Sequence, residues 1–193
     1  MKKVVPMRTA ITQGAMFFAI ALATSPALAQ PSPTGNYALE IQDFGVPPQT
    51  ALHTGAPHAP TPLSVPGAAT ISTADLYSRL TAKQPMLLLY VNGEAGENAL
   101  SIAGSHWLPG AGLGQSFSDA TQARLAKKVD QLVSRNKNTP IVVFCYDAHC
   151  WLSYNAALRL LNAGYRSILW YRGGREAWKS AGLPLTALTQ DAW

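Results

Sequence analysis

Only two cysteines occur among the 193 residues, Cys145 and Cys150, and both lie in one short stretch, "CYDAHCWLSYNAA" at 145–157. The chain contains no Cys-x-x-Cys pair, no Cys-x-x-Cys-His sequence and no Gly-x-Gly-x-x-Gly run. The thioredoxin-type redox motif, the c-type haem site and the dinucleotide-binding fingerprint are therefore absent. The two thiols instead stand where an apolar run of strand length passes into a helix pattern.

Charged residues are also scarce, at 13% of the chain, and the formal net charge is +5 at pH 7. Residues 1–29 carry three basic and no acidic side chains, which leaves a net charge of +2 on residues 30–193. No basic stripe remains there, so we expect no nucleic-acid partner. The remaining length is enough for one domain with a substantial core.

Long apolar runs are missing as well, except near the start of the chain. Residues 1–29 combine a basic beginning, a short apolar segment at 14–23 and "ALA" at 27–29 before Gln30. This pattern is typical of a cleaved secretory signal peptide. The apolar segment is shorter than the roughly 20 residues of a membrane span, and Pro26 interrupts its end. We therefore expect export to the periplasm, an oxidising compartment, and no stable membrane span.

Proline and glycine divide the exported part into segments. Eight of the fourteen prolines fall in residues 30–66, a Pro-rich N-terminal extension that favours extended backbone and cannot build its own core. Alternating apolar positions at 36–45 predict an edge strand, and His53 and His58 are expected to be solvated loop residues. A single domain is predicted at 67–186, followed by a C-terminal tail at 187–193.

Within 67–186, apolar runs of strand length alternate with helix patterns. Ser72, followed by Asp75 three residues later, predicts the N-cap of a helix that ends near Leu80. Gly164 predicts the end of a later helix at 151–163. Further strands are expected at 86–91, 141–145 and 167–171, and further helices from about residue 120 and through 178. This order predicts an α/β fold with a central parallel sheet and helices on both faces.

Cys145 closes one of these strands, at the edge where open α/β sheets bind ligands. A loop that opens a helix offers backbone N–H groups and the positive end of a helix dipole, which stabilise a thiolate. Because only the thiolate is nucleophilic, this position predicts a reactive Cys145. The alternative is a buried cysteine that packs as a small hydrophobic residue.

The stretch from "PIVVFC" through "WLSYNAALRLLNAGY" to "YRGGREAWKSAGLPL" resembles the catalytic half of a rhodanese domain. The matching features are the strand-ending cysteine, the six-residue loop, the paired glycines and the closing "AGLP". Upstream, residues 71–91 and "IAGSHWLPG" are similar to the opening part of the family, so the resemblance covers about 71–185. "WLPGAG", the cysteine pair before Trp151 and "YRGGREAW" further resemble exported Cys–Cys–Trp proteins associated with PQQ-dependent catabolism.

The resemblance implies a sulfurtransferase without a cofactor, in which Cys145 attacks a donor such as thiosulfate and becomes a persulfide. The backbone amides of the loop, from Tyr146 to Cys150, would cradle the anionic sulfur. Candidate partners are a small sulfur donor or acceptor thiol and a periplasmic quinoprotein dehydrogenase. The predicted substrate-binding residues are Tyr146, Asp147, Ala148, His149 and Trp151.

The individual loop residues have alternative interpretations. Asp147 would oppose an anionic ligand, so we expect it to point outward. His149 is either a proton donor to the site or a solvated residue, and Trp151 is either a pocket wall or part of the core. No metal site is predicted, because Cys145, Cys150 and His149 are too crowded to share one ion.

The chain also departs from the family pattern. Many rhodaneses have Gly in the middle of the loop and Arg at its sixth position, where this chain has Ala148 and Cys150. The strand that usually ends in Asp-x-Arg ends in Tyr90, Val91 and Asn92. The charged groups that bind an anionic donor are thus missing together, which argues against efficient turnover of thiosulfate.

Cys150 has three interpretations. It is a redox partner of Cys145, a thiol that resolves a persulfide, or half of a purely structural disulfide. Alternative functions are a thiol–disulfide oxidoreductase and an inactive accessory protein on a rhodanese scaffold. For any disulfide, the two Cα atoms must lie within ~4.4–6.8 Å of each other.

Overall fold

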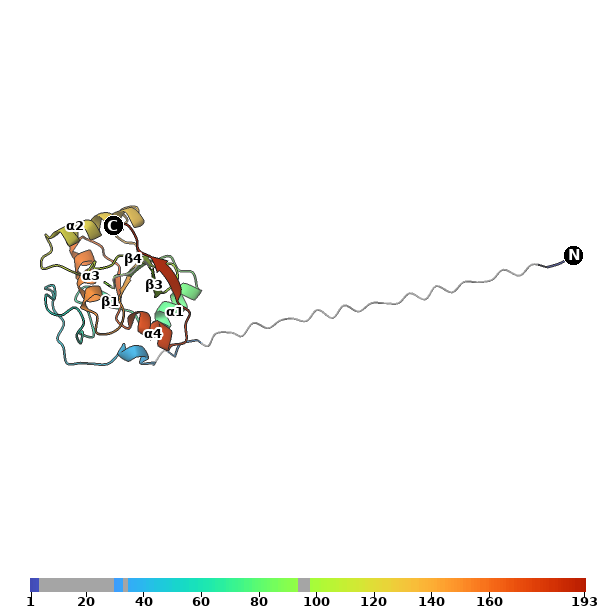
Figure 1. Cartoon of the computed structure of the whole chain (residues 1–193), viewed down its shortest axis with the longest axis horizontal. Helices are drawn as coiled ribbons and strands as arrows, with labels where there is room; N and C mark the ends of the chain where they lie inside the picture. Colours follow the sequence, from blue (N-terminus) through green and yellow to red (C-terminus); the bar gives the residue numbers. More distant parts are fainter. Residues whose placement is uncertain (4–29, 33–34, 94–97) are drawn as a thin grey trace.

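The computed structural model describes residues 1–3, 30–32, 35–93 and 98–193 (Figure 1). The apolar segment and the cleavage site of the predicted signal peptide, at 14–23 and 27–29, lie outside the described residues. Within the described ranges, no helix combines the length and apolar composition that a bilayer span requires.

A five-stranded sheet forms the centre of the fold, and every pair of neighbouring strands in it is parallel. The strand order is β1-β6-β5-β2-β4. The strands are β1 (Ala69–Thr70), β2 (Leu87–Tyr90), β4 (His106–Trp107), β5 (Ile141–Phe144) and β6 (Ile168–Tyr171). The predicted parallel sheet is confirmed, with β5 at its middle.

Helices cover both faces of this sheet, as predicted (Figure 1). Because side chains alternate along a strand, Ile141 and Val143 of β5 pack into one core cluster, and Val142 and Phe144 pack into the other. Double burial explains the continuous apolar run of this strand. One face is covered by α2 (Ala120–Leu132) and α3 (Trp151–Asn162), and the other by α1 (Thr73–Thr81) and α4 (Gly174–Ser180).

The helix boundaries follow the signals in the sequence. The Ser72 side chain accepts a hydrogen bond from the backbone N–H of Asp75 and so caps α1. Asp119 caps α2 in the same way through the N–H of Gln122. Gly164 follows the end of α3 with a φ of +87°, a left-handed conformation that favours glycine.

A second sheet has two antiparallel strands, β3 (Asn98–Ser101) and β7 (Thr186–Thr189), which the sequence analysis did not predict. Residues 187–189, within the segment predicted as a tail, belong to β7. Beyond it, the Asp191 carboxylate lies 2.9 Å from Nδ1 of His106 and 3.0 Å from Nζ of Lys128, so it ties the end of the chain to β4 and α2.

The predicted edge strand at 36–45 is wrong. This segment contains a short 3-10 helix, η1 (Tyr37–Leu39), and Ala38 and Leu39 adopt φ angles of +45° and +62°. Such angles are incompatible with an extended strand. Leu39 and Ile41 are 44% and 56% exposed, so the apolar alternation does not mark a buried face.

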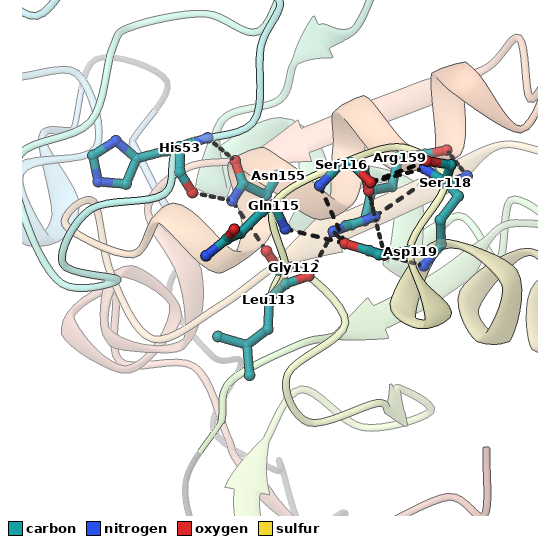
Figure 2. Close-up of polar contacts among 10 residues, drawn as sticks. His53, Gly112, Leu113, Gln115, Ser116, Ser118, Asp119, Asn155 and Arg159 are labelled. Carbon is teal, nitrogen blue, oxygen red and sulfur yellow. Dashed lines mark hydrogen bonds and ion pairs between the residues drawn. The ribbon is translucent and has the colours of Figure 1, made fainter.

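A buried arginine holds the loop between β4 and α2 in place (Figure 2). Arg159 of α3 has no exposed side-chain surface, and its Nη1 and Nη2 donate to the two oxygens of Asp119 at 3.0 and 2.8 Å. The same guanidinium donates to the carbonyl oxygens of Leu113 and Ser116. Hydrogen bonding by Arg159 holds the pKa of Asp119 well below its usual range.

Asp119→Asn is expected to lower the free energy of unfolding by about 3 kcal/mol, because it leaves the buried Arg159 cation without its anion. Since the folded-state pKa is depressed, this stabilisation is present above the unfolded value of about 3.9 and is lost as pH falls through the folded value. Urea titration at pH 7 and at lower pH measures both effects. Asp130→Asn is the matched control; its partner Lys137 is 34% exposed, so the loss should stay below about 1 kcal/mol. Equal losses would contradict the burial argument.

Candidate functional site

The two cysteines form a disulfide across the loop that joins β5 to α3. Their Cα atoms lie 6.1 Å apart, inside the range that a disulfide needs. Cys145 follows β5 directly and is 1% exposed, whereas Cys150 is the N-cap residue of α3 and is 5% exposed. The residue nearest to the positive end of the α3 dipole is thus Cys150, and the disulfide holds the Cys145 sulfur beside it.

The loop backbone is held through its carbonyl oxygens. All six residues from Cys145 to Cys150 have a carbonyl oxygen that accepts a hydrogen bond. The donors, in order, are the N–H of Arg175, the N–H of Glu176, the N–H of Cys150, the Thr61 hydroxyl, the N–H of Ala59 and the Ser153 hydroxyl. The loop conformation is therefore fixed from several directions.

The backbone amides of the loop divide into two groups. His149 donates its N–H to the Asp147 carboxylate at 2.8 Å, and Cys150 donates its N–H to the Asp147 carbonyl at 3.2 Å. Two of the five amides in the predicted cradle from Tyr146 to Cys150 thus already have acceptors within the loop. The amides of Tyr146, Asp147 and Ala148 have no acceptor within the described part of the chain.

The paired glycines of "YRGGREAW" allow α4 to meet the cysteine loop. Gly174 has a φ of +60°, and a Cβ placed on it would lie 2.6 Å from the carbonyl oxygen of Cys145. Only glycine fits such a close approach at this φ. The first amides of α4 then donate to Cys145 and Tyr146 at 3.0 and 2.9 Å, which fixes the start of the loop.

The N-terminal extension lies across the loop from another side. We call residues 57–61 the strap. Cys150 forms an isolated antiparallel bridge with His58, and Trp151 donates its N–H to the Pro57 carbonyl at 2.9 Å. On the far side of the loop, the Thr61 hydroxyl donates to Ala148 at 2.6 Å. The extended backbone expected from the proline content thus serves as a partner for the loop backbone.

Arg172 at the end of β6 anchors the strap. Its guanidinium is 1% exposed and donates to both the hydroxyl and the carbonyl oxygen of Thr61, at 3.1 and 3.0 Å. It also donates to the Glu40 carbonyl at 2.8 Å. Desolvation by burial lowers the pKa of Arg172. The sequence analysis missed Arg172, although a charge directly after a buried strand lies at the same sheet edge as Cys145 and could have indicated it.

The positions where the family usually has charge are uncharged and well packed here. Tyr90 is fully buried between the rings of Trp107 and Phe144. Asn92 donates to the Tyr90 hydroxyl, and its Oδ1 lies 3.8 Å from the Cys145 sulfur. A neutral amide therefore stands beside the cysteine.

Tyr146 and Asp147 are both partly buried. The guanidinium of Arg175 lies 4.4 Å from the centre of the Tyr146 ring, and it is paired with Glu176 at 3.1 Å. The side chain of Asp147 is 19% exposed, and its carboxylate turns back onto the loop to accept from His149. The Arg175 cation next to the loop is thus already neutralised by the Glu176 carboxylate.

The histidines of the extension and the loop stack with aromatic rings. The His149 ring lies 4.8 Å from that of Phe44 and 5.6 Å from that of His58. His53 stacks on Trp151 at a centroid distance of 4.0 Å and is partly buried, so the expectation of a solvated loop residue is wrong for His53. Trp151 is 4% exposed and belongs to the core cluster, yet its edge also lines a pocket.

Two pockets adjoin the loop. The larger, about 490 Å³, has Cys150 in its wall. The smaller, about 170 Å³, is lined in part by His53, Trp151 and Asn155. The remaining lining of the larger pocket is Pro57, His58, Asn92, Gly93, Leu113, Tyr146 and Leu152. The disulfide is thus approached from the Cys150 side.

Similar solved structures are rhodanese-type proteins and uncharacterised domains. A thiosulfate sulfurtransferase from Pseudomonas aeruginosa matches at 23% identity and a TM-score of 0.49, over 65% of this chain but 22% of its own. A protein from Lactobacillus plantarum matches at 21% identity and 0.46, over 62% of this chain and 88% of its own. A polysulfide-sulfur transferase homodimer from Wolinella succinogenes matches at 17% identity and 0.44, over 63% and 80%.

The family comparison is more direct. The model of the rhodanese-like domain matches residues 66–181, which include the whole parallel sheet from β1 to β6, the cysteine loop and α4. The observed strand order and the helices on both faces agree with the fold that the resemblance implied. The chain belongs to the rhodanese-like domain family.

Proposed function

We propose that this chain is a sulfurtransferase in which Cys145 takes up sulfane sulfur as a persulfide and Cys150 releases it as sulfide by re-forming the disulfide. The observation that carries this proposal is the disulfide between the first and last residues of the family's catalytic loop. It sets the second thiol within bonding distance of the first, where the family usually has an arginine.

The cycle that we propose begins with the disulfide. Two external thiols reduce it to two cysteine thiols and become one disulfide themselves. The Cys145 thiolate then attacks the outer sulfur of a donor R–S–SH, which forms Cys145–S–SH and expels R–S⁻. The Cys150 thiolate attacks the inner sulfur of that persulfide and expels HS⁻, and the disulfide is restored. The sum is one persulfide and two thiols converted to one thiol, hydrogen sulfide and one disulfide.

The geometry supports three features of this cycle. Because Cys150 lines the larger pocket, an incoming thiol meets the Cys150 sulfur and displaces Cys145 as the leaving thiolate. The free amides of Tyr146, Asp147 and Ala148 favour the anionic form of a sulfur held on Cys145. The fixed carbonyl contacts of the loop keep the two sulfurs close after reduction.

Cys150→Ser is expected to trap the intermediate, since the persulfide on Cys145 then has no internal thiol to resolve it. Reduced Cys150→Ser treated with a persulfide donor should gain about 32 Da, the mass of one sulfur, on a peptide that contains Cys145. The unsubstituted protein should release sulfide instead and return to the disulfide mass. If Cys150→Ser gains no sulfur and the unsubstituted protein releases no sulfide from any donor, the sulfurtransferase proposal is wrong.

The formed disulfide also favours a second candidate, a thiol–disulfide oxidoreductase. That function predicts ready equilibration of the Cys145–Cys150 pair with glutathione and no requirement for a sulfur donor. An inactive accessory protein predicts a disulfide that resists both glutathione and persulfide. Thiol labelling after each treatment distinguishes the three functions.

The proposal also covers the cellular compartment of the protein and its partner protein. The signal-peptide pattern at 1–29 supports export to the periplasm. The resemblance of the cysteine–tryptophan stretch to the exported Cys–Cys–Trp proteins supports a role beside a PQQ-dependent dehydrogenase. Cell fractionation and the N-terminal sequence of the mature protein test the first, and co-purification with such a dehydrogenase tests the second.

A further inference from the structure

The two pockets beside the loop are adjacent. Both are lined by Pro57, Leu113 and Leu152, so these three side chains stand between the larger pocket at Cys150 and the smaller one at His53. We call the combined space the strap groove. Cys150 lines one end of it, and His53 lines the other.

Much of the strap groove is built by residues that precede the family match. The match begins at residue 66, whereas Pro57 and His58 line the larger pocket and His53, Thr54 and Gly55 line the smaller. The groove is therefore a feature of this chain and its extension.

Asn155 holds the walls of the smaller pocket in position (Figure 2). Its amide nitrogen donates to the carbonyl oxygens of His53 and Gly112, at 2.8 and 3.0 Å, and its oxygen accepts from the N–H of His53. A Cβ on Gly112 would overlap the carbonyl oxygen of Leu152, so the loop packs directly on α3. These contacts fix the walls of the smaller pocket.

The chemistry of the larger pocket does not suit an anionic donor. Its described lining contains no Lys, Arg, Asp or Glu. Arg175 packs on the Tyr146 ring but does not line the pocket, and it is paired with Glu176. A doubly charged donor would lose hydration there, and His58 is the one described lining side chain that could offer it a positive charge. Leu113 is 52% exposed, and covering it would be favourable for an apolar group.

We infer that the strap groove binds the uncharged organic group R of a low-molecular-weight persulfide R–S–SH, with the sulfane sulfur at the cysteine pair. This inference rests on the proposed function and adds the substrate class to it. A volume of about 490 Å³ is in the usual range for small-molecule sites and exceeds what a single oxyanion fills. The sulfur exchange itself is the donor step of the proposed cycle.

Three donors test the inference in the presence of an excess of thiol. Sulfide release from propyl hydropersulfide is expected to have kcat/KM about tenfold higher than that from 2-carboxyethyl hydropersulfide, which has a similar length but carries a charge. Thiosulfate should be used more slowly than either. If the charged persulfide or thiosulfate is used as well as propyl hydropersulfide, the inference is overturned while the sulfurtransferase function stands.

Substitutions at Leu113 link this preference to the groove. Leu113→Ala should raise KM for propyl hydropersulfide about fivefold with little change in kcat. Leu113→Arg should reverse the preference, so that the carboxyethyl donor becomes the better one. Leu100→Ala is the matched control, because Leu100 is 54% exposed and lines neither pocket. Unchanged preferences in both Leu113 variants would overturn the inference.

A binding measurement tests ligand binding in the groove independently of sulfur transfer. Isothermal titration calorimetry of the disulfide form with benzyl methyl sulfide, which has no transferable sulfur, should show binding that Leu113→Ala weakens about fivefold. Thiosulfate should show none. If the thioether binds but no donor transfers sulfur, the inference about the groove stands and the proposed sulfurtransferase function is wrong. Absence of thioether binding would overturn the inference.

Discussion

Cys145→Ser is expected to lower persulfide-dependent sulfide release by at least about a thousandfold. A serine hydroxyl is un-ionised near neutral pH and does not form a persulfide, so the first covalent bond of the cycle is never made. The assay is sulfide release from propyl hydropersulfide with excess thiol, accompanied by the intact mass of the protein. No addition of sulfur at position 145 should be detected.

Cys150→Ser is the matched control for this prediction. Both substitutions remove the same disulfide, and a six-residue ring stabilises the fold by about 2 kcal/mol on the loop-entropy model, so both variants should lose similar stability. Only Cys150→Ser should still load one sulfur per chain. If Cys150→Ser lost all loading and Cys145→Ser retained it, the two cysteines would have exchanged roles, with the nucleophile at the N-cap of α3.

The helices and the three longer strands of the parallel sheet, β2, β5 and β6, were predictable because their signals are local. Double burial of β5 shows as an unbroken apolar run, and the caps at Ser72 and Gly164 mark helix ends within a few residues. The parallel sheet then places Cys145 at the ligand-binding edge. The position of the disulfide within a tight loop was foreseen as geometrically permitted, and the observed Cα separation of 6.1 Å agrees.

The strap was not predictable, because its contacts are carried by backbone atoms and by residues far apart in sequence. The Pro57 carbonyl and the Ala59 amide bond to the loop whatever their side chains are. Apolar alternation at 36–45 misled the prediction, since the left-handed residues Ala38 and Leu39 prevent an extended chain. Proline-rich composition indicated extended backbone but gave no information on its partner.

The missing family charges have a structural consequence. The acid and arginine positions are taken by Tyr90 and Asn92, which leaves the loop without its usual charged support. A buried cation is still present at the same edge of the sheet, but it comes from Arg172, whose hydrogen bonds reach the loop through Thr61. Support for the loop thus comes from a residue that lines neither of the two pockets beside it.

Arg172→Met should therefore release the strap from the loop and lower the free energy of unfolding by about 3 kcal/mol. The substitution leaves the carbonyl oxygens of Thr61 and Glu40 buried without donors, each at a cost of about 1–3 kcal/mol. Urea titration measures the stability. Hydrogen exchange measures the release, because the amides of Ala59 and Trp151, which join the strap to the loop, should lose protection.

Three variants test whether Arg172 acts by holding the strap against the loop or whether the loss of any arginine has the same effect. Arg166→Met removes an exposed arginine and should change neither measurement. Thr61→Val removes the hydroxyl that links Arg172 to Ala148 and should expose the strap amides, whereas Thr61→Ser keeps the hydroxyl and should protect them. If Arg172→Met lowered stability but left Ala59 and Trp151 as protected as before, Arg172 would be only a buried structural residue. Loss of protection in Arg172→Met and Thr61→Val, with recovery in Thr61→Ser, would establish that the extension holds the cysteine loop through Thr61.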